Sequence, residues 1–223
     1  ELTLNPMVRI VARFSDTVNV PSFGVPVVQI DQFKPKMTLG CSYSAPPHLA
    51  MWLEGSPFEV RRSLEDWERM AVFYVKVCGQ GRGTVRTMPI LGDALVRYRT
   101  HASDFEAMGV GLARLSAALF AAGAVEVHSP LPGADPLTKA SEAASLEGVL
   151  NGRNASLSAI HLHSTVRMGD SRRAGADSFG CLYGADNVWV NDSSLLPTSP
   201  GVNPQGAILA IARRNVLRWL DER

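Results

Sequence analysis

The sequence predicts an α+β fold built on a mixed or antiparallel sheet. Segments rich in β-branched residues occupy residues 8–14 and 27–33, which is typical of strands. Residues 104–122 instead repeat apolar side chains every three and four positions, which is typical of a helix with one buried face. Strands and helices do not alternate as regular β-α-β units. We therefore expect a sheet covered by helices, with the last segment of the chain returning to pack beside an earlier part.

The first half of the chain contains further predicted elements. Pro21, Gly24 and Pro26 form the turn between the first two predicted strands. The pattern over residues 59–76 favours a helix, although its last residues are β-branched and aromatic. Residues 84–88 follow a glycine-rich turn and predict a short strand.

The helix over residues 104–122 is the clearest element. Ser103 and Glu106 form the sequence pattern of a capping box at its start, and Gly123 is placed to end it. Its expected buried face consists of Phe105, Met108, Leu112, Leu115 and Leu119.

Three more elements are expected toward the end of the chain. Residues 140–150 predict a helix, and residues 188–190 predict a buried strand. A last helix starts near Gln205. It is expected to turn these side chains inward: Ile208, Ile211, Ala212, Val216 and Leu220.

Charge, apolar runs and cysteine spacing limit the class of protein. The formal net charge of +1 gives no electrostatic reason to expect a nucleic acid or an anionic membrane as partner. No apolar run reaches the roughly 18 residues of a membrane span, and the opening residues do not resemble a secretion signal. Cys41, Cys78 and Cys181 lie too far apart for a CxxC zinc site, and their odd number does not suggest a disulfide framework. A cytoplasmic location is the expectation.

Residues that can carry chemistry are concentrated after residue 160. His161 and His163 are two positions apart, so on a strand both would lie on one face and could bind a metal. The further ligands considered in this region are Asp170 and Asp192, and we predict no metal site.

Three motifs in this region resemble the C-terminal signature of the GMC (glucose–methanol–choline) oxidoreductases. They are His-x-x-Ser-Thr-x-Arg-Met-Gly from His161, Asp-Ser-Ser-x-x-Pro-Thr from Asp192, and Asn-Pro-x-Gly from Asn203. Ser164 departs from the family pattern, where glycine is usual, and His163 is an additional imidazole beside the expected one.

The resemblance implies an enzyme that oxidises a small-molecule alcohol with FAD. In the family a base takes the hydroxyl proton while a hydride leaves the alcohol carbon for flavin N5, and His161 matches that base. Asn203 matches the second catalytic position, where a side chain donates a hydrogen bond to the same oxygen. The residues that the resemblance implies beside FAD are Asp192, Ser193, Asn203, Pro204, Gln205 and Gly206.

The resemblance also implies two functional parts of this chain and a third part on another polypeptide. Residues 1–160 correspond to the substrate-binding domain, and residues 161–223 to a strand-helix segment that completes an FAD-binding, Rossmann-like domain. The dinucleotide-binding fingerprint Gly-x-Gly-x-x-Gly does not occur in this sequence. Gly79, Gly81 and Gly83 lie close together, but their spacing does not match it. We therefore expect a companion polypeptide to carry the half that binds the ADP part of FAD.

Three alternative functions stay open at this stage. A flavin-containing hydroxynitrile lyase would use the same fold without net redox chemistry. A non-catalytic subunit would only complete the fold of a partner, although the presence of both His161 and Asn203 argues against it. A metal-dependent hydrolase would be built on His161 and His163.

Overall fold

A computed structural model describes residues 1–53, 55–88, 92–171 and 173–221. The chain forms two compact units, each assembled from separate parts of the sequence. Unit 1 comprises Glu1–Asn5, Cys78–His101 and Ala159–Arg223, and unit 2 comprises Pro6–Val77 and Ala102–Ser158. These units follow a different division from the functional one drawn at residue 160, which stays a prediction.

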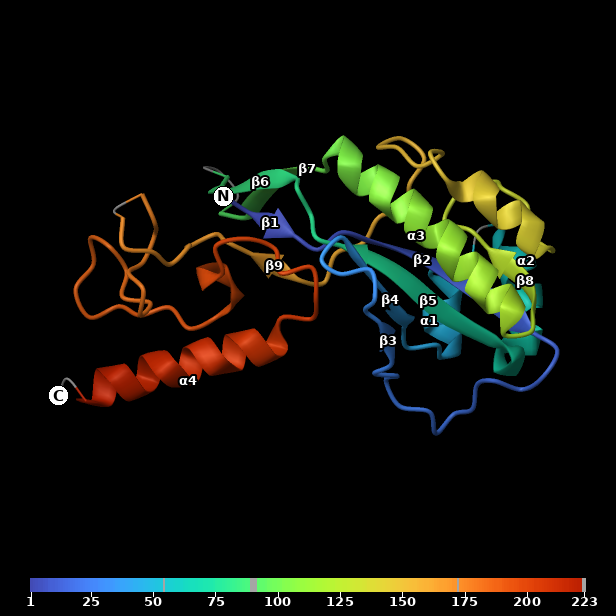
Figure 1. The fold of residues 1–223 in the computed structure, drawn as a ribbon, viewed down its shortest axis with the longest axis horizontal. Helices are drawn as coiled ribbons and strands as arrows, with labels where there is room; N and C mark the ends of the chain where they lie inside the picture. Colours follow the sequence, from blue (N-terminus) through green and yellow to red (C-terminus); the bar gives the residue numbers. More distant parts are fainter. Residues whose placement is uncertain (54, 89–91, 172, 222–223) are drawn as a thin grey trace. The chain divides into compact units, whose positions relative to one another are not determined.

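A five-stranded antiparallel sheet forms the centre of unit 2, so the α+β class is confirmed (Figure 1). In spatial order the strands are β3 (Gln29–Ile30), β4 (Met37–Cys41), β5 (Met70–Val77), β2 (Met7–Phe14) and β8 (Ala124–His128). The predicted strand over residues 8–14 is the long β2, whose Ile10 lies opposite Phe73 of β5.

One face of this sheet is covered by the helix α3 (Ala102–Ala121), which confirms the predicted helix (Figure 1). The helix begins two residues before the predicted start, so Ser103 lies inside it and the predicted capping box is wrong. Met108, Leu112, Leu115 and Leu119 of α3 join the core formed by the apolar side chains of β2, β4 and β5. Gly111 allows the close approach, since a Cβ there would lie 2.4 Å from Cγ1 of Val75.

Beside α3, residues Ala140–Leu146 form the 3-10 helix η2. The prediction of a helix over residues 140–150 is therefore confirmed only for its first part, and as a 3-10 helix.

The other face of the sheet packs on short helices. These are α1 (Pro46–Ala50), α2 (Pro57–Ser63) and the 3-10 helix η1 (Leu64–Arg69). Val11, Met70 and Val72 of the sheet form a second core with Leu49 and Leu53.

Two sequence predictions in unit 2 are wrong in part. The predicted helix over residues 59–76 ends at Arg69, because the β-branched and aromatic residues of β5 pair with β2 and β4 as a central strand. The predicted strand over residues 27–33 shrinks to β3, a two-residue edge strand. Val27 and Val28 beside it are 87% and 69% exposed, so they have no packing that would extend the strand.

Unit 1 contains two small antiparallel pairs and one long helix. The pairs are β1 (Thr3–Leu4) with β9 (Leu162–His163), and β6 (Arg82–Thr87) with β7 (Ala94–Arg99). The predicted strand over residues 84–88 is thus confirmed within β6. A 3-10 turn η3 (Ser193–Leu195) and the helix α4 (Gln205–Asp221) complete the unit.

Two predictions in unit 1 need correction. Residues 188–190 are not a buried strand: Trp189 makes an isolated bridge with Cys181, and Val188 is 44% exposed. The helix α4 starts at Gln205 as predicted, but Val216 and Leu220 are 45% and 55% exposed instead of turned inward. The described residue that α4 buries is Asn215, whose amide donates to Oδ1 of Asn191 at 3.0 Å.

Candidate active site

The pairing of β9 with β1 fixes the backbone that carries both histidines. Thr3 lies opposite His163 in this pair, and the backbone N–H of Asn5 donates to the carbonyl of His161 at 3.3 Å. The two imidazole rings lie with their centroids 6.4 Å apart and their planes 22° from parallel. The spacing of two residues therefore places both rings on one side of the segment, as predicted.

Burial distinguishes the two imidazoles. His163 is 1% exposed, and neither of its ring nitrogens has a hydrogen-bond partner among the described residues. Burial, and then the charge of His161, lower the pKa of His163 to about 4, so its ring is neutral near pH 7. His161 is half-buried, which leaves it the more accessible of the two rings.

Ser164 explains why glycine is favoured at its position in the motif. Its φ is +71°, in the left-handed region that a residue with a Cβ adopts at a cost of about 1–2 kcal/mol. Its hydroxyl lies 2.7 Å from the hydroxyl of Thr3, and both residues are 1% exposed. The hydrogen bond between these buried hydroxyls helps to hold a backbone conformation that serine otherwise avoids.

The segment around Asp192 lies directly against the histidine segment. Ser193 donates its hydroxyl to the carbonyl of Leu162 at 2.7 Å, and Val166 N–H donates to the carbonyl of Ser194 at 3.2 Å. Asp192 is exposed and caps η3, because its Oδ1 accepts the N–H of Ser194 at 2.7 Å. The turn-capping role of Asp192 is thus present, and a role toward a cofactor stays a prediction.

Asn5 connects the histidine segment to the loop before Asn203, a role that the sequence did not predict. Besides the backbone bond to His161, its buried amide donates to the carbonyl of Val202 at 3.0 Å. Its Oδ1 accepts the N–H of Gly201 at 3.3 Å and the hydroxyl of Ser199. The signal in the sequence was an asparagine before Pro6, a common loop dipeptide that gives no hint of such distant partners.

Asn203 and the residues after it lead into α4. Asn203, Gln205 and Gly206 are exposed, whereas Pro204 is buried and its carbonyl accepts the N–H of Ile208 at 2.9 Å. The N-terminus of this helix offers backbone N–H groups and a partial positive charge. The predicted site residues therefore all belong to unit 1, and hydrogen bonds join the segments that carry them.

Unit 2 contains polar side chains that sequence reasoning also missed. Arg9, Tyr74 and Lys76 lie on the sheet face away from α3, and Arg9 and Lys76 are 6% and 0% exposed. The guanidinium of Arg9 lies 4.3 Å from the ring centroid of Trp52. Desolvation, and then the charge of Lys34, lower the pKa of Lys76 to about 8. Tyr74 and Lys76 alternate with apolar residues at the end of β5, but that segment was predicted to be a helix. Arg9 lies in β2, a segment that was predicted to be a strand.

Neither a metal-binding cluster nor a membrane-spanning helix occurs in the described part of the chain. In residues 1–53, 55–88, 92–171 and 173–221, no group of three or more His, Cys, Asp or Glu side chains is placed to hold a metal ion. The same ranges contain no helix with the length and apolar character required to span a membrane.

Comparison with known proteins relates this chain to one enzyme family. The family model described as GMC oxidoreductase matches residues 81–212. An uncharacterised GMC-type oxidoreductase of Sinorhizobium fredii is 31% identical over 215 residues, which cover 96% of this chain and 43% of that protein. A long-chain-alcohol oxidase of Arabidopsis thaliana is 28% identical over 82% of this chain and 25% of its own length.

A solved structure shares the fold. The crystal structure of pyridoxine 4-oxidase from Mesorbium loti matches with a TM-score of 0.66 and 19% identity, covering 99% of this chain and 43% of that one. The 223 residues thus span less than half the length of these relatives.

Proposed function

Because this chain belongs to the GMC oxidoreductase family, we propose that it forms the active-site part of an FAD-dependent enzyme that oxidises an alcohol, with His161 as the base. The oxidoreductase class follows from the family. The alcohol substrate, the cofactor and the residue roles are the content of the proposal.

The observation that carries the proposal is the convergence of three motif segments in unit 1. Asn5 binds the backbone at His161 and the loop that ends at Asn203, and Ser193 binds the strand that carries His163. Segments about 40 residues apart are thus held together by backbone and side-chain hydrogen bonds, as a catalytic site requires.

His161 is the imidazole suited to act on an alcohol. A base must come within hydrogen-bond reach of the substrate hydroxyl, and the half-buried His161 has the accessibility that the fully buried His163 lacks. Removing the hydroxyl proton converts a poor hydride donor into an alkoxide, which is a good one. The exposed amide of Asn203 would donate a hydrogen bond to the same oxygen and favour the developing negative charge.

The chain offers groups that fit the redox-active ring of FAD. The 17-residue helix α4 begins with the exposed Gln205 and Gly206, and an added Cβ at Gly206 would meet no atom within 4 Å. Backbone N–H groups at the N-terminus of α4 would stabilise negative charge on the flavin ring. Asp192 and Ser193 would bind the part of FAD that adjoins this ring. When bound, FAD would supply the acceptor for the hydride from the alcohol carbon.

The exposed apolar side chains of α4 support the proposal that another polypeptide covers this helix. The large apolar side chains exposed along this helix are Leu209 (62%), Val216 (45%), Leu217 (45%) and Leu220 (55%). Apolar side chains grouped in this way are typical of a surface that another part of a protein covers. We assign that role to the dinucleotide-binding half, which would also bind the ADP part of FAD. Stoichiometric binding of FAD by the isolated 223-residue chain would contradict this assignment.

Flavin reduction by an alcohol tests the proposal. The purified protein, with any flavin and polypeptide that accompany it, is mixed anaerobically with a long-chain primary alcohol or with pyridoxine, and flavin absorbance is followed. We expect bleaching that slows by about a hundredfold or more in His161→Ala. The matched variant His163→Ala should retain most of the rate, with FAD content measured in both proteins.

Each contrary outcome has a distinct meaning. A loss confined to His163→Ala would reverse the choice of base, and equal losses would remove the support for either. Retention of FAD with no bleaching by any alcohol, together with cleavage of a cyanohydrin, would favour the lyase alternative.

A further inference from the structure

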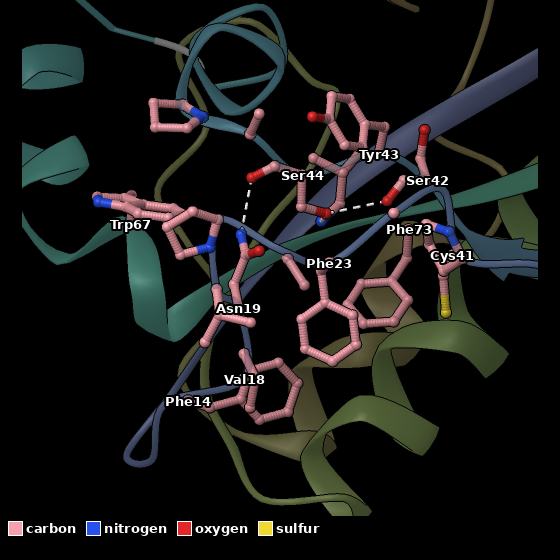
Figure 2. Close-up of a pocket in the computed structure, with 18 residues that line it drawn as sticks. Phe14, Val18, Asn19, Phe23, Cys41, Ser42, Tyr43, Ser44, Trp67 and Phe73 are labelled. Atoms are coloured by element: carbon pink, nitrogen blue, oxygen red, sulfur yellow. Dashed lines mark hydrogen bonds between the residues drawn. The ribbon is translucent and has the colours of Figure 1, made fainter.

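A cavity of about 560 Å³ lies within unit 2, at one end of the sheet (Figure 2). Phe14, Ala71 and Phe73 of β2 and β5 form one of its surfaces. Residues 42–46, where β4 leads into α1, form a second wall, and the loop over residues 18–26 forms a third. The volume falls in the range of about 300–1,000 Å³ that is usual for small-molecule sites.

Buried hydrogen bonds hold the wall formed by the loop. Asn19 is 6% exposed, and its amide donates to the carbonyls of Ser44 at 2.7 Å and Met70 at 3.1 Å. The backbone N–H groups of Val18 and Asn19 both donate to the carbonyl of Glu68 at 2.9 Å. The loop is therefore anchored to the sheet and to η1 at the point where it enters the cavity wall.

The lining determines which kind of molecule fits. Among the 18 described residues that line the cavity, none is Asp, Glu, Lys, Arg or His. Its aromatic members are Phe14, Phe23, Tyr43, Trp67 and Phe73. An ion entering such a site would lose its hydration without a charged partner, which is unfavourable by several kcal/mol as an order of magnitude.

A small polar contribution comes from side-chain hydroxyls. The hydroxyl of Ser44 is used within the wall, donating to the carbonyl of Ser42 at 2.9 Å and accepting the N–H of Val72 at 2.9 Å. Those of Ser42 and Tyr43 have no hydrogen-bond partner among the described residues, so they are available to one polar group of a ligand.

We propose that this cavity binds an uncharged, mainly apolar molecule that carries one hydroxyl or carbonyl group, such as an aromatic or aliphatic alcohol. The inference concerns unit 2 by itself and does not rest on the oxidoreductase activity. The aromatic side chains of the lining contact the apolar part of the ligand, and the absence of charged side chains disfavours ions. A hydroxyl of residues 42–46 forms a hydrogen bond with the ligand's polar group and thereby orients it.

Calorimetric titration with two ligands of similar size, one neutral and one anionic, tests whether the cavity excludes charged molecules. The purified protein should bind 2-naphthalenemethanol at least tenfold more tightly than 2-naphthoate. In Ala71→Phe, which fills the cavity, binding of the alcohol should weaken by tenfold or more. The control Ala118→Phe adds the same side chain on the exposed side of α3 and should leave binding unchanged. Equal affinity for the alcohol and the carboxylate, or unchanged binding in Ala71→Phe, would overturn the proposal.

Alkylation of the unmodified protein provides a second test that does not depend on the folding of a variant. Cys41 lines the cavity and is half-buried, whereas Cys181 lies in unit 1 and serves as the internal control. Burial raises the pKa of both thiols, so the reaction with N-ethylmaleimide is run at mildly alkaline pH and followed by mass spectrometry. Saturating 2-naphthalenemethanol should slow modification of Cys41 several-fold and leave Cys181 unchanged. Equal rates for Cys41 with and without the alcohol would refute occupancy of the cavity.

Discussion

Replacement of Asn5 by alanine should both destabilise unit 1 and disturb the candidate active site. The variant loses the side-chain hydrogen bonds to Val202, Gly201 and Ser199, while the backbone bond to His161 can persist. Each such bond contributes about 0.5–1.5 kcal/mol, and a partner left unsatisfied in the interior costs about 1–3 kcal/mol. Since Asn5 is 0% exposed, water cannot replace the amide without rearrangement, and we expect a loss of roughly 3–4 kcal/mol in the free energy of unfolding.

Urea denaturation of the wild type, Asn5→Ala and the control Asn151→Ala measures this loss. Asn151 is exposed and its side chain bonds locally, so its replacement should cost less than about 1 kcal/mol. Anaerobic flavin reduction then tests the link to function. If Asn5 positions the loop before Asn203, the rate at saturating alcohol should fall about tenfold or more, with a smaller change in the alcohol concentration that gives half the maximal rate. A destabilisation below about 1 kcal/mol would refute the reasoning on stability, and an unchanged reduction rate would refute the positioning role.

Two further predictions concern the neighbouring residues. At Ser164, glycine and alanine both remove the hydroxyl bonded to Thr3, but only glycine avoids a Cβ at φ +71°, so Ser164→Gly should unfold with about 1–2 kcal/mol more free energy than Ser164→Ala. Equal values in urea denaturation would mean that the left-handed backbone has no cost there. At His163, the pKa lowered to about 4 means that the unfolded chain takes up a proton near the ordinary value of 6.5 while the folded chain does not. Stability should therefore fall by up to roughly 2 kcal/mol as the pH drops from about 6.5 to 4, allowing for solvent screening. His163→Leu should remove that part of the pH profile, and an identical profile in the variant would contradict the low pKa.

The α+β class, the long helix α3 and the start of α4 could be predicted from the amino-acid sequence. These features depend on local spacing: apolar residues every three to four positions specify a helix, and Gly123, with φ +95°, ends one. The motif residues after His161 were also recognisable, because their order along the chain is itself the signal. The sequence further indicated Ser164 as unusual, and its positive φ supplies the physical reason.

Tertiary structure decided what local patterns leave undetermined. Residues 70–77 have side chains compatible with a helix or a strand, and pairing with β2 and β4 made them a strand, which buried Lys76 on one face. The position of His161 in the motif predicted it as the base, and the structure adds that His163 is 1% exposed, a difference in burial that the spacing of two residues cannot express; the role of His161 stays a prediction. Asn5 acquired its importance through partners almost 200 positions away. Such contacts are invisible to periodicity, because they exist only after the chain has folded and brought distant segments within hydrogen-bond distance.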